Sequence, residues 1–488
     1  MSPTTLIAVT LAVPIIGAVF IAAFHRQPNL REAVTLLTAV LLFTCVIALL
    51  PQVLGGAQPA LHLLDVLPGL ALTFRVEQLG MLFALVASGL WILNSLYSFG
   101  YMRSNGESHQ TRFYVCFALA LAASIGIAYA GNAFTLFVFY ELLTLVTYPL
   151  VTHHGTKEAQ RGGRIYLGLL LGTSMVFLLP AVIFTWKVAG TTDFQPGGIL
   201  DGQVTGLALA GLLALYMFGI GKAALMPFHR WLPAAMVAPT PVSALLHAVA
   251  VVKAGVFCVV KVIVYVFGID LLAANAGTAW LVPVAGFTIL AASVVALRAD
   301  NLKRRLAYST VSQLSYVVLA AALLAPLSLI GAVMHIAAHA LGKITLFFAA
   351  GAIYTAAHKT NVSQLDGIGR RMPWTMGAFA IGALSMIGLP PAAGFVSKWY
   401  MLAGAMEASR WTAVAVIIAS TLLNAGYFLP VVYRAFFRAP VAGDHDHPHG
   451  EAPLLMVLAL TATAAGTVLL FFLPDVPLAL ARQMLTGG

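Results

Sequence analysis

Charged residues are scarce in this sequence of 488 residues, of which only 9% are Asp, Glu, Lys or Arg and 61% are hydrophobic. Soluble domains carry roughly 25% charged residues, so the composition excludes an ordinary soluble protein. The mean hydropathy of +0.95 indicates a polytopic membrane protein. The net charge of +10 does not indicate nucleic-acid binding, because no basic stripe with interleaved aromatic residues occurs.

Cysteine is also rare, and Cys45, Cys116 and Cys258 each lie within an apolar segment. They have neither metal-ligand spacing nor a disulfide pattern, so we expect small buried apolar side chains, no metal and no cofactor. The N-terminal apolar segment lacks the preceding basic residues of a signal peptide. It is therefore expected to be a retained helix.

Apolar segments long enough to cross about 30 Å of hydrocarbon are abundant. About fourteen are predicted, near residues 4–24, 32–54, 76–100, 112–130, 132–152, 164–188, 205–236, 240–267, 276–297, 304–324, 328–354, 374–403, 410–438 and 453–473. Seventeen of the 26 Lys and Arg residues fall in one set of alternate loops, and four in the other. Because cytoplasmic loops are enriched in Lys and Arg, both termini are expected on the non-cytoplasmic side of the cell membrane, a bacterial inner membrane.

The predicted span at 331–354 is apolar, yet it carries His335, His339 and Lys343. Spacings of i, i+4 and i+8 place these side chains on one face of a helix. Ionisable groups at membrane depth cost a few kcal/mol or more, and their usual explanation is an ion or proton path. The alternative is a buried polar helix that satisfies its neighbours.

Other ionisable residues within the predicted spans are mostly bases. They are the carboxylate Glu141 and the bases Lys222, His247, Lys253, Lys261 and Lys398. A cage for an alkali cation needs several oxygen ligands, whereas buried amines and imidazoles gain and lose protons. The set therefore favours protons as the transported ion, although Lys261 lies near a span end, where it can equally extend to the interface.

Two lysines lie beside prolines that interrupt a helix. Pro227 follows Lys222 in the seventh span, and Pro390 and Pro391 precede Lys398 in the twelfth. Broken helices at membrane depth mark transport paths in inverted repeats. We therefore expect an all-α protein with two inverted five-helix repeats and broken helices 7 and 12. Its divisions are 1–111 (helices 1–3), 112–267 (helices 4–8), 276–438 (helices 9–13) and 453–488 (helix 14 and a tail).

Two further polar segments have ordinary interpretations. Ser309, Ser312, Gln313 and Ser315 in the tenth span are expected to make interhelical hydrogen bonds. The loop at 442–451 alternates His445, His447 and His449 with Asp444 and Asp446. This alternation is compatible with a transition-metal site, but a solvated loop is favoured because nothing closes the site.

Four stretches together resemble a known family: GKAALMPFHRWLPAAMVAPTPVSALLHAVAVVKAG, RRLAYSTVSQLSY, MHIAAHALGKITLFFAAGAI and GLPPAAGFVSKW. They resemble signature stretches of the antiporter-like proton-translocating subunits of respiratory complex I, membrane-bound hydrogenases and Mrp-type multisubunit sodium/proton antiporters. The resemblance covers roughly residues 75–440. It implies a fourteen-helix core with a central hydrated axis of ionisable residues.

The resemblance also implies roles for individual residues. Glu141 matches a glutamate that pairs with the lysine at Lys222. The eighth-helix positions His247 and Lys253 match residues that bridge two half-channels. The eleventh-helix relay corresponds to His335, His339 and Lys343, and the terminal lysine to Lys398.

Among family members, the chain most resembles the Mrp D-type subunit, although its eighth helix is similar to the A-type. This implies a transporter subunit rather than an enzyme, with other membrane subunits as partners. It implies that the chain transports protons, and it leaves open that partner subunits couple this transport to Na⁺. Alternatives are a proton-pumping subunit of a complex I or hydrogenase-type oxidoreductase, a haem- or quinone-binding redox subunit with ligands such as His335 and His247, and an autonomous carrier of small anions.

Overall fold

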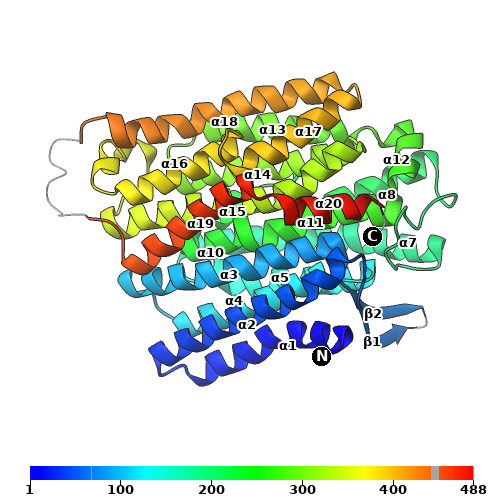
Figure 1. Cartoon of the computed structure of the whole chain (residues 1–488), viewed down its shortest axis with the longest axis horizontal. Coiled ribbons are helices and arrows are strands. Elements are labelled where there is room, and N and C mark those ends of the chain that lie inside the picture. The colour runs from blue at the N-terminus through cyan, green and yellow to red at the C-terminus, as the bar shows by residue number, and fades with distance from the viewer. Residues whose placement is uncertain (68, 441–449, 487–488) are drawn as a thin grey trace.

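The computed structural model describes residues 1–67, 69–440 and 450–486, and it is a bundle of helices with one β-hairpin (Figure 1). The helices before the first break are α1 (Pro3–Ala23), α2 (Pro28–Leu54), α3 (Gln78–Ser104), α4 (Gln110–Ala128), α5 (Ala133–Val151), α6 (Lys157–Thr173), α7 (Leu179–Ala189) and α8 (Gly206–Gly219). The middle of the chain forms α9 (Trp231–Ala234), α10 (Thr240–Ala244), α11 (Val251–Val262), α12 (Ile269–Ala274), α13 (Leu281–Arg298) and α14 (Leu302–Ala322). The remaining helices are α15 (Pro326–Ala357), α16 (Pro373–Ile387), α17 (Ala393–Glu407), α18 (Trp411–Phe437), α19 (Leu454–Phe472) and α20 (Asp475–Thr486).

Short 3₁₀ and π segments join or interrupt these helices. The 3₁₀ segments are η2 (Gly221–Ala223), η3 (Ala235–Val237), η6 (Ala276–Thr278), η7 (Val362–Gln364) and η8 (Ile368–Arg370), and the π segments are η1 (Ser174–Leu178), η4 (Leu245–Val249) and η5 (Ile263–Phe267). The antiparallel hairpin of β1 (Ala60–Leu67) and β2 (Leu70–Arg75) connects α2 to α3. The apolar pattern of the sequence predicts no strand in this connection.

The helical content confirms the predicted all-α membrane class. Within the described residues, ten helices are long and apolar enough to cross a membrane. The other predicted spans correspond to α14, whose sequence is more polar, and to helices that form in pieces: α8 with α9, α10 with α11, and α16 with α17. Helices 7 and 12 are thus broken as expected, while the count of fourteen and the inverted repeat stay predictions.

The long helix α15 lies at the centre of the bundle, and 94% of its most apolar window is buried. It packs against α3, α10, α14, α16, α17, α19 and α20. By contrast, only 33% of the corresponding windows of α1, α2, α18 and α19 is buried. The exposed faces of these outer helices are apolar, as expected for contact with lipid.

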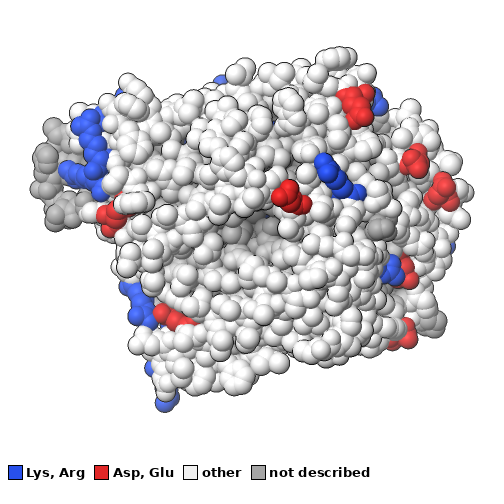
Figure 2. Space-filling model, in the orientation of Figure 1, with Lys and Arg blue, Asp and Glu red and all other residues white. Residues whose placement is uncertain are grey.

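Charged side chains on the face shown in Figure 2 gather mainly at the two ends of the bundle, and most of the surface between the ends is uncharged apart from an acidic and a basic group right of centre. Lys and Arg predominate at the end near the grey segment, and Asp and Glu at the opposite end. The start of α1 and the end of α20 both lie toward the hairpin end of the bundle (Figure 1). Residues 475–486, predicted as a tail, instead form α20, whose spaced residues Leu480, Ala481 and Met484 pack inward.

Candidate functional site

Lys222 lies where the seventh predicted helix is interrupted. The helix α8 ends at Gly219, and Lys222 follows in η2 with its side chain fully buried. Its Nζ donates to the Tyr140 carbonyl at 2.7 Å and to the Thr144 hydroxyl at 2.6 Å, and both acceptors belong to α5. The break therefore places an amine against the middle of α5.

Glu141 is the next residue of α5 after Tyr140, and it is 8% exposed. Within the described part of the chain, no ion pair shorter than 4.0 Å joins the Glu141 carboxylate to Lys222. The predicted pair is thus adjacent but not in contact. Because Glu141 lies beside the site of the Lys222 amine without pairing with it, a small shift between α5 and η2 would change the interaction of the two groups.

Lys253 lies in α11, which approaches η2 closely because residue 255 is glycine. A Cβ at Gly255 would collide with the backbone nitrogen of Ala223. The Nζ of Lys253 lies 2.5 Å from Nδ1 of His339 on α15. A hydrogen bond between two nitrogens needs one proton between two lone pairs, so a proton can pass directly between these groups. His247 lies in η4, and its side chain is outside the described part of the structure.

His335 stands one turn before His339 on α15, with the two rings 5.8 Å apart. Its Nε2 faces the Gln313 amide oxygen at 3.1 Å, and its Nδ1 lies 2.8 Å from the Ser397 hydroxyl. That hydroxyl is also 3.1 Å from the Gly394 carbonyl. When His335 is neutral, Ser397 donates to Nδ1. When His335 is protonated, Nδ1 donates to Ser397, whose hydrogen turns to Gly394.

Lys343, the third member of the face on α15, leads to a separate set of partners. Its Nζ donates to the Ser309 hydroxyl at 2.8 Å. The Tyr427 hydroxyl lies 3.1 Å from the same Ser309 oxygen and also contacts the Asn424 side-chain oxygen. The Asn424 amide then donates to the Met386 carbonyl at 3.4 Å. Polar side chains of α14 and α18 thus connect Lys343 to the end of α16.

Lys398 binds two backbone carbonyls that the broken helix leaves free. Its Nζ donates to Met386 O at 2.7 Å and to Ile387 O at 3.1 Å. In a continuous α-helix these carbonyls would accept from the backbone nitrogens of Pro390 and Pro391, which carry no hydrogen. The two prolines therefore both end α16 and create the binding site for the Lys398 amine.

The Met386 carbonyl joins the two sets of contacts, because it also accepts from the Gln313 amide at 3.3 Å. One branch runs from His335 through Gln313, and the other from Lys343 through Asn424. Both branches end at the carbonyl that holds Lys398. The residues predicted from α15 and α17 are therefore brought together, and they are buried.

Sequence reasoning missed part of this network. Ser397, Tyr427, Asn424 and the Met386 carbonyl were not singled out, and Ser309 and Gln313 were assigned only to interhelical hydrogen bonds. The interhelical interpretation holds for Ser312, which contacts Ser293, while Ser315 bonds within its own helix. Asn424 and Tyr427 are three residues apart in an apolar segment and form one polar patch on α18. This spacing is the feature of the sequence that indicates a polar contact on α18.

Lys261 points toward the hairpin end of the bundle, where Glu77 precedes α3 and Ala130 follows α4. It is fully buried, its Nζ lies 2.8 Å from Glu77 Oε1 in an ion pair, and it donates to the Ala130 carbonyl at 2.8 Å. This pair is separate from the network on α15. Its two partners come from segments far apart in the sequence, which is why spacing could not reveal it.

The described residues hold no group of three or more His, Cys, Asp or Glu side chains arranged to bind a metal ion. The alternating residues Asp444, His445, Asp446, His447 and His449 lie outside the described residues. Glu451, which follows them, accepts hydrogen bonds from Trp374 N at 2.7 Å and from the Thr375 hydroxyl at 2.6 Å. It therefore caps the N-terminus of α16.

Comparisons with known proteins identify the family of the chain. Residues 130–424 match the family model described as NADH:quinone oxidoreductase/Mrp antiporter, TM. The chain is 35% identical to NADH-quinone oxidoreductase subunit N of Desulforudis audaxviator over 77% of each protein. It is 24% identical to the D-type subunit of the Na(+)/H(+) antiporter of Alkalihalophilus pseudofirmus, over 96% of this chain and 94% of that protein.

The fold has a counterpart among solved structures. A chain of the Mrp complex from Dietzia sp. DQ12-45-1b superimposes with a TM-score of 0.88 at 22% identity, covering 100% of this chain and 97% of that one. The family match includes the break at Lys222, the buried face of α15 and the break before Lys398. The chain belongs to the transmembrane family shared by NADH:quinone oxidoreductases and Mrp antiporters.

Proposed function

We propose that the chain is a proton-translocating subunit of a multisubunit membrane complex, of the D type of a Mrp-like monovalent cation/proton antiporter. The observation that carries the proposal is the buried network of amines, imidazoles and hydroxyls from Lys253 through α15 to Lys398. Its members exchange protons rather than hold a metal ion. The partners are sibling membrane subunits, through which Na⁺ or another cation crosses.

The proposed path has two parts that meet at Lys253. In the first, a change in the distance between Glu141 and the Lys222 amine changes how strongly that amine holds its proton. In the second, Lys253 and His339 share a proton, and His335 passes one on by reorienting the Ser397 hydroxyl. The contacts of Lys343 and of His335 both lead to the Met386 carbonyl that holds the Lys398 amine, so a change of protonation at either residue changes how firmly Lys398 is held.

The shared length with relatives supports the D type. The chain covers 94% of the D-type subunit of the Alkalihalophilus pseudofirmus antiporter but 54% of the A-type subunit from the same organism. A second candidate is a proton-pumping subunit of a complex I or hydrogenase-type oxidoreductase, and the 35% identity to the NADH-quinone oxidoreductase relative favours it. The proteins that copurify with the chain distinguish the two candidates.

A haem-ligating role for the α15 histidines has less support. Both ring nitrogens of His335 are engaged, by Ser397 and Gln313, so ligation would require breaking one of these contacts. The orientation that we propose is the one with the basic end of the bundle in the cytoplasm of a bacterial cell and both termini outside.

Glu141→Gln tests the proposal. The amide keeps the shape of the side chain but removes its charge and its ability to bind a proton. Proton flux through the purified complex in liposomes should fall about tenfold, because each ~1.4 kcal/mol of lost stabilisation along the path is a factor of ten in rate. Glu158→Gln, on the exposed start of α6, is the matched control and should transport normally. Equal flux in both variants would contradict the proposal.

Tyr427→Phe tests the Lys343 branch alone. It removes only the hydroxyl that contacts Ser309 and Asn424, and it leaves the His335 branch intact. Because a parallel route remains, we expect a fewfold slower flux, roughly the effect of ~1 kcal/mol for one hydrogen bond. Combining Tyr427→Phe with Gln313→Leu should lower flux by much more than the product of the single effects. Multiplicative effects would mean that the two branches are not alternatives.

A further inference from the structure

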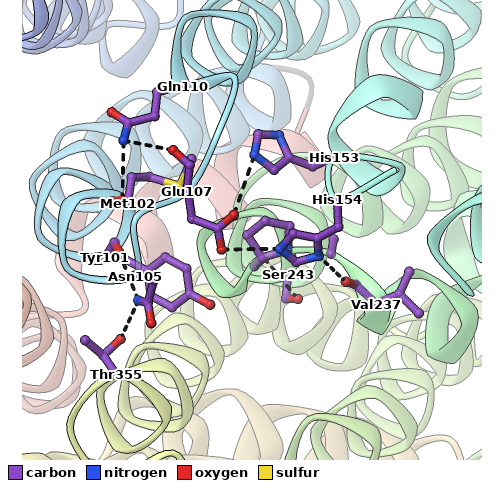
Figure 3. Close-up of polar contacts among 12 residues, drawn as sticks. Tyr101, Met102, Asn105, Glu107, Gln110, His153, His154, Val237, Ser243 and Thr355 are labelled. Atoms are coloured by element: carbon purple, nitrogen blue, oxygen red, sulfur yellow. Dashed lines mark hydrogen bonds and ion pairs between the residues drawn. The ribbon is translucent and has the colours of Figure 1, made fainter. Parts of the chain in front are cut away.

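A cluster of titratable groups lies outside the buried network, at the basic end of the bundle. Glu107 belongs to the loop between α3 and α4, and His153 and His154 to the loop between α5 and α6 (Figure 3). Glu107 Oε1 lies 3.3 Å from His154 Nε2, and Glu107 Oε2 lies 3.8 Å from His153 Nε2. The Glu107 side chain is 11% exposed and that of His154 is 36% exposed. The carboxylate is therefore nearly enclosed, while one imidazole reaches solvent.

The Glu107 loop is held in place by amide side chains. Gln110 donates to the Glu107 carbonyl at 3.1 Å, and Asn105 donates to the Tyr101 carbonyl and the Thr355 hydroxyl, each at 2.9 Å (Figure 3). The last contact ties the loop to the end of α15. The position of the Glu107 carboxylate is therefore set by the bundle, and not by the loop alone.

The contacts of His154 require that the pair hold a proton. Its Nδ1 faces the Val237 carbonyl at 3.2 Å, so Nδ1 carries a hydrogen. In a neutral ring with that tautomer, Nε2 is an acceptor, and it would face a carboxylate oxygen that is also an acceptor. A proton must lie between Nε2 and Glu107 for this contact to be favourable.

The neighbouring His153 differs in its surroundings. Burial lowers the pKa of His153 to about 4, so this ring stays neutral at physiological pH. The hydrogen bond with Glu107 raises the pKa of His154 above its ordinary value, and the Val237 carbonyl contributes to the same effect. The raised pKa means that His154 keeps its proton at a lower proton concentration than a free imidazole would.

The pair opens into a cavity of about 240 Å³ between the loops and the helix ends. Its wall includes Lys303, whose Nζ donates to the Ala238 carbonyl at 2.6 Å, next to the carbonyl that His154 holds. Ala350 of α15 also lines it, and Lys343 lies seven residues earlier on that helix, about 10 Å along its axis. Other charged or titratable groups facing the pair or the cavity are Tyr101, Arg112, His153, Tyr354 and Lys359.

We propose that Glu107 and His154 form a proton-binding site that loads the cavity above α10 and α15 from the cytoplasm. This inference rests on the proposed function. The site captures protons at the loop surface. It holds them beside the start of α10, from which the chain continues through η4 into α11 and Lys253. His154 contacts the Val237 carbonyl and Lys303 donates to the Ala238 carbonyl, just before α10 begins. Protonation of the Glu107–His154 pair is therefore linked to the position of the start of α10.

Transport measured against pH tests the site. His154→Asn keeps a donor for the Val237 carbonyl but cannot be protonated. The proton concentration that gives half-maximal flux should rise about tenfold, because a site that binds protons has been lost. The maximal rate at acidic pH should change less than about twofold, because the later steps of transport are unaffected. The control His109→Asn lies in the same exposed loop as Glu107, where His109 has a φ of 51° that Asn adopts readily. A fall in rate by one factor at every pH would indicate a merely structural role and would overturn the proposal.

A second measurement does not depend on transport. In the complex with ¹⁵N-labelled histidine, the signal lost in His154→Asn identifies His154, and the proton affinity of that ring should fall at least severalfold in the Glu107→Gln variant. An unchanged titration midpoint would overturn the site itself. If the midpoint falls but the wild-type complex moves no protons, the proposed function fails while the proton-binding pair stands.

Discussion

Replacing Lys343 with methionine should abolish proton transport, with a loss of about a hundredfold or more. Methionine matches the length and shape of the buried lysine stem, so the packing of α15 is kept. The substitution removes the amine that donates to Ser309. It also removes a positive charge from the face of α15 that carries His335 and His339, so both branches are affected, whereas Tyr427→Phe leaves that amine in place. A loss of about 3 kcal/mol along the path corresponds to two factors of ten in rate. The measurement is proton flux through the purified complex in liposomes, driven by a pH gradient.

Two companion variants decide what Lys343 contributes. Lys187→Met changes an exposed lysine on α7 and should leave flux unchanged. Lys343→Arg keeps a positive charge that cannot be given up, because a guanidinium does not deprotonate in proteins. If Lys343 transfers protons, the Arg variant should be as inactive as the Met variant. Substantial flux with Arg would show that only the charge is needed.

Lys261→Met should destabilise the folded chain by about 3–5 kcal/mol, because it leaves the Glu77 carboxylate buried without its partner. Glu77 is 6% exposed and Lys261 is fully buried, so water cannot compensate for the lost contact. The effect is measured as a lower midpoint of unfolding of the purified complex, followed by intrinsic tryptophan fluorescence or by thiol accessibility of Cys258, which is buried.

The double variant Glu77→Gln with Lys261→Met separates the pair from simple loss of packing. It removes both charges, so most of the stability lost in Lys261→Met should return. Glu77→Gln alone leaves a buried amine that still donates to the Ala130 carbonyl and should be intermediate. Equal stability of the wild type and the Lys261→Met variant would mean that this ion pair does not hold the hairpin end of the bundle together.

Much of the fold was accessible from the sequence because the membrane restricts it. Apolar length predicts where helices cross, and the prolines at 227, 390 and 391 predict where helices break, since each removes a backbone donor. The face formed by His335, His339 and Lys343 follows from the helical period alone, and the structure places all three inside the bundle. These signals depend only on residues that are close together in the chain, so they can be interpreted without knowing which helices touch.

What the sequence could not predict depends on which helices touch. The ion pair of Lys261 with Glu77 and the contact of Lys253 with His339 join residues that are far apart in the chain. The Met386 carbonyl has no side-chain signature at all, because its role comes from a donor that the following prolines lack. The sequence does not reveal β1 and β2 either, since the residues of β1 do not alternate between apolar and polar and most of them are exposed.

The prolines after α16 bear on how this protein can be engineered. Replacing Pro390 and Pro391 with alanine would restore two backbone donors, and a straightened α16 would then satisfy Met386 and Ile387 by itself. Such a variant would gain helical stability, yet the Lys398 amine would have to compete with those backbone donors for both carbonyls. Thermostability and turnover are therefore opposed at this turn, and a search for more heat-resistant variants would select against transport.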